Sequence, residues 1–378
     1  MRRVENQTLL RRHAQDQRLH GLRGHPIASL TEPSIPLAMM SLPAVGPRSR
    51  ELNFVLEALR TATSVLRAVA PSTSTLEKSD RTPVTAADLG VQAVLAGLLL
   101  RAFPEDVLVA EESAETLRRP EATRLRTEVV AASRLVLPEA DSDRVLAWLD
   151  RGRGEPAQRF WTLDPVDGTK GLLRGGQYAT VLGLIDDGDI VVAGLACPRY
   201  PEGAMAAGGS FAVAVRGAGG WTAPSLDGPW TRLAVSAETD PHRCRLLRSV
   251  ESGRKTDERL ADLRRALGTA APEIRMDSQV KYLALAAGIG DLIVRLPRKG
   301  GALRENIWDH ACGVLLVEEA GGRCTDVLGS RLDFRSARQM ERNLGVVASN
   351  TSLHEAALEA LRSTGTADQA EGTTDDAS

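Results

Sequence analysis

The sequence predicts a mixed α and β protein, in which an α+β half precedes an α/β half. Residues 52–69 and 85–98 show the helical spacing of apolar side chains. The apolar segments 178–185 and 190–197 flank the sequence Asp-Asp-Gly-Asp, which is typical of a β-hairpin. From about residue 240 onward, strand-like and helix-like segments alternate. With 378 residues, 43% of them hydrophobic, the chain can fill the core of both halves.

The two ends of the chain are expected to lie outside the folded halves. Residues 1–47 are rich in arginine and proline-containing, so they are predicted to form a disordered extension. The polar and acidic residues 363–378 are predicted to form a disordered tail. The α+β part then covers residues 48–235 and the α/β part residues 236–362.

The composition excludes several classes of protein. The 47 basic and 49 acidic residues give a net charge of −2, so neither a nucleic acid nor a membrane surface is an expected partner. The four cysteines contain no CxxC pair, which argues against a zinc site or a disulfide framework. No long apolar run occurs that would serve as a membrane span or a secretory signal. A cytoplasmic location is therefore predicted.

Lysine is rare in this chain. Only five of the 47 basic residues are lysines, namely Lys78, Lys170, Lys255, Lys281 and Lys299. Lysine is a compact point charge on a flexible stem, so it is expected to persist where such a charge is needed. The alternative is that these five are the remainder of a general bias towards arginine.

The segment WTLDPVDGTKG, residues 161–171, places Asp164 and Asp167 on either side of a proline and a valine. Taken alone, such a run is more often a turn than a site, because proline presets φ and Asp-Gly tolerates a tight backbone. It lacks the acidic ladder of an EF-hand and the Gly-Lys-Ser/Thr of a Walker A loop.

Other acidic residues occur where predicted elements begin or end: Asp80 in a loop, Glu111 and Glu112 after a strand, and Asp309 at a helix start. If the fold gathers them with the two aspartates of WTLDPVDGTKG, their mutual repulsion would require cations. A set of oxygen ligands without His or Cys favours Mg²⁺, which often binds substrate phosphate. Two ions about 3.5 to 4 Å apart can activate water and stabilise the leaving oxygen at phosphorus. The residues thus predict a phosphoesterase site.

Four motifs together carry a resemblance to a known family: DRTPVT, EES, WTLDPVDGTKGLLRGGQYA and NIWDHACGVLLVEEAGG. They resemble the inositol monophosphatase and fructose-bisphosphatase superfamily of lithium-sensitive, Mg²⁺-dependent phosphatases, over roughly residues 50 to 362. This resemblance implies a five-layer αβαβα sandwich. Within the superfamily, DGTKGLLRGGQYA and DSQVKYLALAAGIGDLIVRLP look most like the 3'(2'),5'-bisphosphate nucleotidases, which convert adenosine 3',5'-bisphosphate to AMP.

The resemblance also implies roles for individual residues. Roughly two or three Mg²⁺ ions would be held by Glu111, Asp164, the Val166 carbonyl, Asp167 and Asp309. The catalytic water would be oriented and deprotonated by Asp80 and Thr169, with support from Glu111. The scissile phosphate would be bound by Gly168 and Thr169, and the 5'-phosphate side of a small nucleotide bisphosphate by Ser278, Lys281 and Arg295.

Some residues depart from the family pattern or have simpler interpretations. Where the nucleotidases commonly carry a histidine near the base, this chain has Arg254-Lys255-Thr256. Asp88 is expected to cap a helix within Thr-Ala-Ala-Asp, His310 to cap or pack, and Glu112 to lie behind the metal ligands. Two other functions stay open: a phosphatase for inositol phosphates, and a catalytically silent nucleotide sensor.

Overall fold

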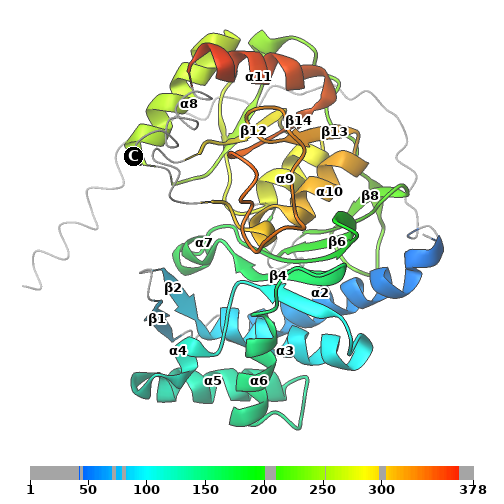
Figure 1. The fold of residues 1–378 in the computed structure, drawn as a ribbon, viewed down its shortest axis with the longest axis vertical. Coiled ribbons are helices and arrows are strands. Elements are labelled where there is room, and N and C mark those ends of the chain that lie inside the picture. Colours follow the sequence, from blue (N-terminus) through cyan, green and yellow to red (C-terminus); the bar gives the residue numbers. More distant parts are fainter. Residues whose placement is uncertain are drawn as a thin grey trace, which may run out of the picture. The chain divides into compact units, whose positions relative to one another are not determined.

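The computed structural model describes residues 42, 46–69, 74–78, 82–200, 210–251, 253–297 and 304–365 (Figure 1). All of them belong to one compact unit, residues 39–378. Most of the predicted extension, the predicted tail beyond residue 365 and Asp80 lie outside the described residues, so these predictions stay predictions. None of the described helices is both long enough and apolar enough to pass through a membrane.

The larger sheet has seven strands in the order β3-β4-β5-β6-β7-β8-β9. Their bounds are Val107–Ala110, Arg159–Asp167, Ala179–Asp186, Asp189–Cys197, Ser210–Val215, Gly219–Ala223 and Thr231–Arg232. β3 and β4 are parallel and the other neighbours are antiparallel. The predicted hairpin is β5-β6, whose two-residue loop has positive φ at Asp187 (52°) and Gly188 (83°), as a type I′ turn requires.

Two long helices cover one face of this sheet, α2 (Ser49–Val69) against β5 and β6, and α3 (Ala86–Ala102) against β4. α2 comes close to β6 because Gly194 has no side chain: a Cβ there would lie 2.2 Å from Val55 Cγ1. α3 begins with the predicted capping box. The shorter helices lie beyond α3 in Figure 1, with the bounds α4 Glu115–Arg118, α5 Thr123–Arg134 and α6 Ser142–Arg151.

The segment before α3 was expected to be an irregular loop, and the structure instead has a small antiparallel ribbon there. Its strands are β1 (Thr75–Glu77) and β2 (Pro83–Thr85). The backbone N–H of Lys78 donates to the Thr82 carbonyl at 2.8 Å, which continues the pairing. Pro83 is tolerated because this ribbon is only two strands wide, so one side of each strand needs no hydrogen-bonding partner.

The smaller sheet has five strands in the order β11-β10-β12-β14-β13. In that order their bounds are Ile274–Arg275, Leu246–Arg248, Leu292–Arg295, Val346–Asn350 and Gly322–Thr325. α9 (Val280–Ala286) and α10 (Ala311–Glu319) lie between the two sheets, while α8 (Arg254–Leu267) and α11 (His354–Ser363) cover the far face (Figure 1). The predicted five-layer αβαβα sandwich is therefore confirmed.

Short helical turns connect these elements. The 3₁₀ helices are η2 Gly46–Arg48, η4 Pro120–Ala122, η6 Pro241–Arg243, η7 Ile307–Asp309 and η8 Thr351–Leu353. Asp309 was expected at the start of a helix and ends η7, just before α10. Residues 277–290 have the apolar spacing of a helix, but the helix is confined to α9, because Ser278 has a left-handed φ of 58° and Gly288 one of 72°.

Candidate metal and phosphate site

The ends of two parallel strands bring the acidic motifs together. β3 ends at Ala110, directly before Glu111, and β4 ends at Asp167. Parallel neighbours have their carboxyl ends at the same edge of a sheet. The Glu111 N–H donates to the Leu163 carbonyl at 3.2 Å, so Glu111 lies beside Asp164. The predicted proximity of these two motifs is thus a consequence of the β3-β4 pairing.

In the motif WTLDPVDGTKG, the residues up to Asp167 belong to β4, and their pairing with β5 becomes irregular within the motif. Asp164 pairs with Val181 and Asp167 with Ala179, so the register shifts between them. Pro165 cannot donate to the ladder, and its carbonyl accepts from Thr180 Oγ1 at 2.7 Å. The irregularity displaces the backbone from the ladder, and the Asp164 carboxylate accepts the Val166 N–H at 3.0 Å.

Gly168 ends the strand and leads into the short helix α7 (Thr169–Arg174). Its φ of 90° is unfavourable for residues with a side chain. A Cβ on Gly168 would also lie 3.2 Å from Cβ of Ser278. Gly168 and Ser278, both predicted to bind phosphate, are therefore neighbours although they come from different halves of the chain. The absence of a side chain at Gly168 allows this close approach.

Electrostatics shows that the predicted metal-binding carboxylates act on one another. Burial, followed by the negative charges of Glu111, Asp167 and Asp309, raises the pKa of Asp164 well above its usual range. Burial, followed by Asp167 and Glu111, does the same to the pKa of Asp309. The pKa of Asp167 is also raised by burial, although the nearby Lys281 ammonium opposes the shift. Such a cluster is costly unless positive charge is supplied.

Each of these carboxylates meets a protein partner. Lys78 Nζ lies 2.8 Å from Glu111 Oε1 and 2.5 Å from Glu112 Oε1, so Glu112 lies behind Glu111 as predicted. Asp167 accepts the Gln279 N–H at 2.5 Å, and Asp309 accepts from Asn306 Nδ2 at 3.2 Å.

In these side-chain positions, no three His, Cys, Asp or Glu residues of the described chain form a group that could hold a metal ion. The donor set nevertheless fits a hard cation, because it offers only carboxylates and the Val166 carbonyl. Its charges are also mutually repulsive. The coordination itself stays a prediction.

Thr169 is held by a residue that the sequence suggested only as a helix cap. Its hydroxyl donates to Asp88 Oδ1 at 2.9 Å and lies 3.2 Å from the Val166 carbonyl. Asp88 is fully buried, also accepts from the N–H of Thr85, and burial raises its pKa to about 6. Asp88 therefore completes the capping box of α3, as predicted, and also holds Thr169, which nothing in the Thr-x-x-Asp spacing could have revealed.

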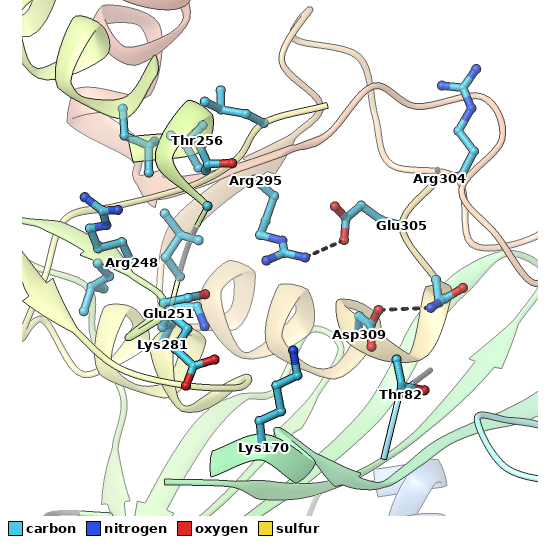
Figure 2. Close-up of a pocket in the computed structure, with 18 of the residues that line it drawn as sticks. Thr82, Lys170, Arg248, Glu251, Thr256, Lys281, Arg295, Arg304, Glu305 and Asp309 are labelled. Carbon is cyan, nitrogen blue, oxygen red and sulfur yellow. Dashed lines mark hydrogen bonds and ion pairs between the residues drawn. The ribbon is translucent and has the colours of Figure 1, made fainter. Parts of the chain in front are cut away.

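A cavity of about 690 Å³ adjoins the carboxylates (Figure 2). Glu111 and Asp309 line it together with residues of the smaller sheet and of α8, among them Leu247, Leu260, Thr256 and Arg295. A second cavity of about 200 Å³ is lined by Asp167, Ser278, Lys281, Arg295 and Asp309. The two cavities share Lys281, Arg295 and Asp309, so predicted metal ligands and predicted substrate-binding residues line the same hollows.

The cations predicted to bind the 5'-phosphate are already engaged. Lys281 is 6% exposed, and its ammonium donates to the carbonyls of Ser278 (2.8 Å) and Met276 (3.3 Å). Burial lowers the pKa of Lys281 to about 8. Arg295 lies 3.1 Å from Glu305 Oε2.

Glu305 is a residue that the sequence did not single out. The same carboxylate oxygen that faces Arg295 lies 3.0 Å from His310 Nε2. His310 in turn contacts the Tyr282 hydroxyl at 2.7 Å through Nδ1. His310 is therefore a buried packing residue, as expected, and not a free base.

The chain resembles curated 3'(2'),5'-bisphosphate nucleotidases over most of its length. That of Emericella nidulans is 36% identical over 319 residues, which are 76% of this chain and 90% of the relative. That of Oryza sativa is 34% identical over 348 residues, or 85% of this chain and 96% of the relative. That of Schizosaccharomyces pombe is 36% identical over 301 residues, or 75% and 85%.

Solved structures share the fold at lower identity. An IMPase of Thermotoga maritima superposes with a TM-score of 0.60 at 19% identity, covering 83% of this chain and 97% of that one. An IMPase/NADP phosphatase complexed with Mg²⁺ and phosphate gives 0.57 at 17% identity, covering 82% and 94%. At these identities the likeness shows the fold alone. The sequence model described as the inositol monophosphatase family matches residues 48–366, and the chain belongs to that family.

Proposed function

We propose that the protein is a Mg²⁺-dependent phosphomonoesterase that removes the 3'-phosphate from adenosine 3',5'-bisphosphate and leaves AMP. The observation that carries this proposal is the shared hollow. It joins the carboxylates Glu111 and Asp309 to the cations Lys281 and Arg295, as a substrate with two phosphates requires. The names of the relatives, 31 to 36% identical, support the same activity.

The carboxylate cluster is the proposed place of the metal ions. Glu111, Asp164, Asp167, Asp309 and the Val166 carbonyl would hold two or three ions. Bound Mg²⁺ would neutralise phosphate charge and acidify water at this site. Without it, burial and mutual repulsion favour protonation of Asp164 and Asp309, so the two aspartates would not act as anions together.

The Asp88–Thr169 pair is the proposed general base. The Thr169 hydroxyl donates a hydrogen bond to Asp88. The lone pairs of Thr169 Oγ1 can therefore accept a hydrogen bond from the attacking water. As the water oxygen bonds to phosphorus, the bond from phosphorus to the ribose 3'-oxygen breaks. The proton of the water passes to Thr169 and the Thr169 proton to Asp88, while the departing 3'-oxygen takes up a proton from solvent water. The resemblance implies this role for Asp80, which lies outside the described residues.

The turn at Gly168 is the proposed cradle of the scissile phosphate. The backbone N–H groups of Gly168 and Thr169 would donate to the phosphate oxygens, directly beside the carboxylates. Ser278, which is in close contact with Gly168, would extend this cradle towards the second phosphate.

The composition supports a small-molecule substrate in the cytoplasm, with neither nucleic acid nor membrane as a partner. The net charge is −2, and the four cysteines, Cys197, Cys244, Cys312 and Cys324, are free and buried. Free thiols are typical of a reducing compartment.

A substrate panel tests the proposal. Phosphate release is measured from adenosine 3',5'-bisphosphate, inositol 1-phosphate and inositol 1,4-bisphosphate, with Mg²⁺ and with added Li⁺. We expect the nucleotide to have the highest kcat/KM, activity to need Mg²⁺, and Li⁺ to inhibit. Faster turnover of either inositol compound would overturn the substrate assignment, and no release from any of them would favour a silent sensor.

Asp167→Asn supplies the matched negative variant for this panel. Loss of one charge from the cluster should abolish turnover of every substrate in the panel. Asp143→Asn, an exposed aspartate on α6, is the control and should leave turnover unchanged.

A further inference from the structure

The cations that line the larger cavity differ in whether they have a protein partner. Arg295 faces Glu305, and Arg248 bonds to Glu273 at 3.1 Å and to Asp257. Arg304 donates to the Asn343 carbonyl at 3.0 Å, and Lys281 donates to two backbone carbonyls. Lys170 also lines the cavity, but its ammonium has no hydrogen bond or ion pair with any described residue.

The position of Lys170 follows from the start of α7. Thr169 is the first residue of that helix and turns its hydroxyl towards Asp88. The next residue lies about 100° further around the helix, and its side chain therefore leaves in another direction. Figure 2 shows the Lys170 side chain extending into the cavity, with Arg295 reaching in from the opposite wall.

Three of the four acidic residues that line this cavity have cations of their own; the fourth, Asp309, accepts from the Asn306 amide. Glu251 forms an ion pair with Arg174, and Glu111 forms one with Lys78. Glu305 is held by Arg295 and His310. The Lys170 charge is thus not needed to neutralise these side chains, and an exposed ammonium on a flexible stem is suited to meeting an anionic ligand.

Charge balance indicates which phosphate Lys170 would meet. The scissile phosphate is assigned to the Gly168 turn and the carboxylate cluster, where metal ions would supply positive charge. The second phosphate has Arg295, whose charge is offset by Glu305, and Lys281, whose buried ammonium already donates to two carbonyls. A phosphate bearing nearly two negative charges needs a further cation there.

We propose that Lys170 is a specificity-determining residue whose ammonium binds the phosphate that is not hydrolysed, together with Arg295. This inference rests on the proposed function and names a substrate contact beyond Ser278, Lys281 and Arg295. It also gives a physical reason for a lysine in a chain where 42 of 47 basic residues are arginines. A lysine can shift its charge along a four-carbon stem as the ligand settles, without imposing a planar fork.

The test compares Lys170→Met with the wild type on two substrates that differ only in the second phosphate. These are adenosine 3',5'-bisphosphate and adenosine 3'-monophosphate; the latter is measured as a competitive inhibitor if its turnover is too slow. We expect kcat/KM for the bisphosphate to fall about 10- to 100-fold, the range for a hydrogen bond to a charged group, mainly through KM. The value for the monophosphate should change less than about threefold.

Arg67→Met, which removes an exposed cation from α2, is the control and should change neither value. Equal losses on both substrates for Lys170→Met would place Lys170 at the scissile phosphate and overturn the inference. No loss on either substrate would overturn it too. The proposed function fails separately, if the wild type itself does not hydrolyse adenosine 3',5'-bisphosphate. Retained activity on the monophosphate shows that Lys170→Met is folded.

Discussion

At the scale of single residues, the Asp88–Thr169 hydrogen bond links the start of α3 to the turn that holds the scissile phosphate. Among the described residues, the hydrogen bonds to the Asp88 carboxylate come from Thr85 and Thr169. A buried carboxylate of this kind, with a pKa raised to about 6, can accept a proton near neutral pH.

Asp88→Asn tests this role against the one predicted for Asp80. The amide cannot take up the proton, so kcat should fall at least about 100-fold with little change in KM. Asp80→Asn is the comparison, because the resemblance implies the same role for Asp80, and its loss of kcat should be the smaller of the two. Melting temperatures are measured for both, because Asp88 also caps α3. A larger loss of kcat in Asp80→Asn than in Asp88→Asn would contradict the assignment.

The sequence predicted which single residues belong to the site better than it predicted which of them contact one another. Glu111, Asp164, Asp167 and Asp309 stand in short acidic motifs, which is why they could be named as a cluster. Asp88 and Thr169 are 81 positions apart, and their contact depends on where α3 meets α7. Hydrogen bonds of this kind are determined by the tertiary structure, so no pattern of residue spacing in the sequence predicts them.

At the scale of elements, α9 and α10 form the layer that both sheets share. They approach closely because Gly313 on α10 has no side chain: a Cβ there would lie 2.3 to 2.7 Å from atoms of Tyr282 on α9. Tyr282 is buried and bonds to His310, so it has little freedom to move. Close packing in this layer therefore fixes both Asp309, just before α10, and Lys281 on α9.

Gly313→Ala should therefore destabilise the protein. Overpacking of a filled core typically costs 1 to 3 kcal/mol, and we expect about 2 kcal/mol in the free energy of unfolding by urea. Gly253→Ala is the control, because a Cβ there meets no atom within 4 Å and its φ is −73°. An unchanged unfolding free energy in Gly313→Ala would show that the layer can relax.

Helix and strand identities were largely predictable from periodicity, whereas several boundaries were not. The pattern of 277–290 is helical throughout, but the helix starts only at Val280, after Ser278 with its left-handed φ of 58°. The β1-β2 ribbon was missed because three-residue strands are too short to show alternation.

At the scale of the whole molecule, the site depends on both halves of the sandwich. The larger sheet brings Glu111 and Asp167, and the smaller sheet and its helices bring Arg295, Lys281 and Asp309. The sequence could suggest the two sheets from hairpin and alternating patterns. The strand order within them, such as β12 between β10 and β14, follows from long-range pairing and was not predicted.

The stability of the whole fold should depend on His354, which ties β13 and β14 to α11. It is fully buried and lies 2.9 Å from Thr325 Oγ1 and 2.8 Å from Ser349 Oγ. Burial lowers its pKa to about 4, against about 6.5 when unfolded. As the pH falls, His354 therefore takes up a proton in the unfolded chain before it does so in the folded protein. The free energy of unfolding consequently decreases between pH 6.5 and 4.

Urea unfolding at pH 7 and pH 5 measures this effect. The wild type should lose up to about 2 kcal/mol from His354 over this interval, and His354→Gln should lack that component. His242→Gln, an exposed histidine, is the control and should keep the wild-type difference. If His354→Gln and the wild type lose the same free energy, the histidine is not held neutral by the fold.

The central claim is that the protein hydrolyses one particular phosphate of a nucleotide bisphosphate. The most direct measurement is phosphorus NMR of adenosine 3',5'-bisphosphate during turnover with Mg²⁺. The account predicts that the 3'-phosphate signal is replaced by inorganic phosphate while the 5'-phosphate of AMP persists. Accumulation of adenosine 3'-monophosphate would contradict it, because the scissile phosphate would then be the one assigned to Lys170 and Arg295.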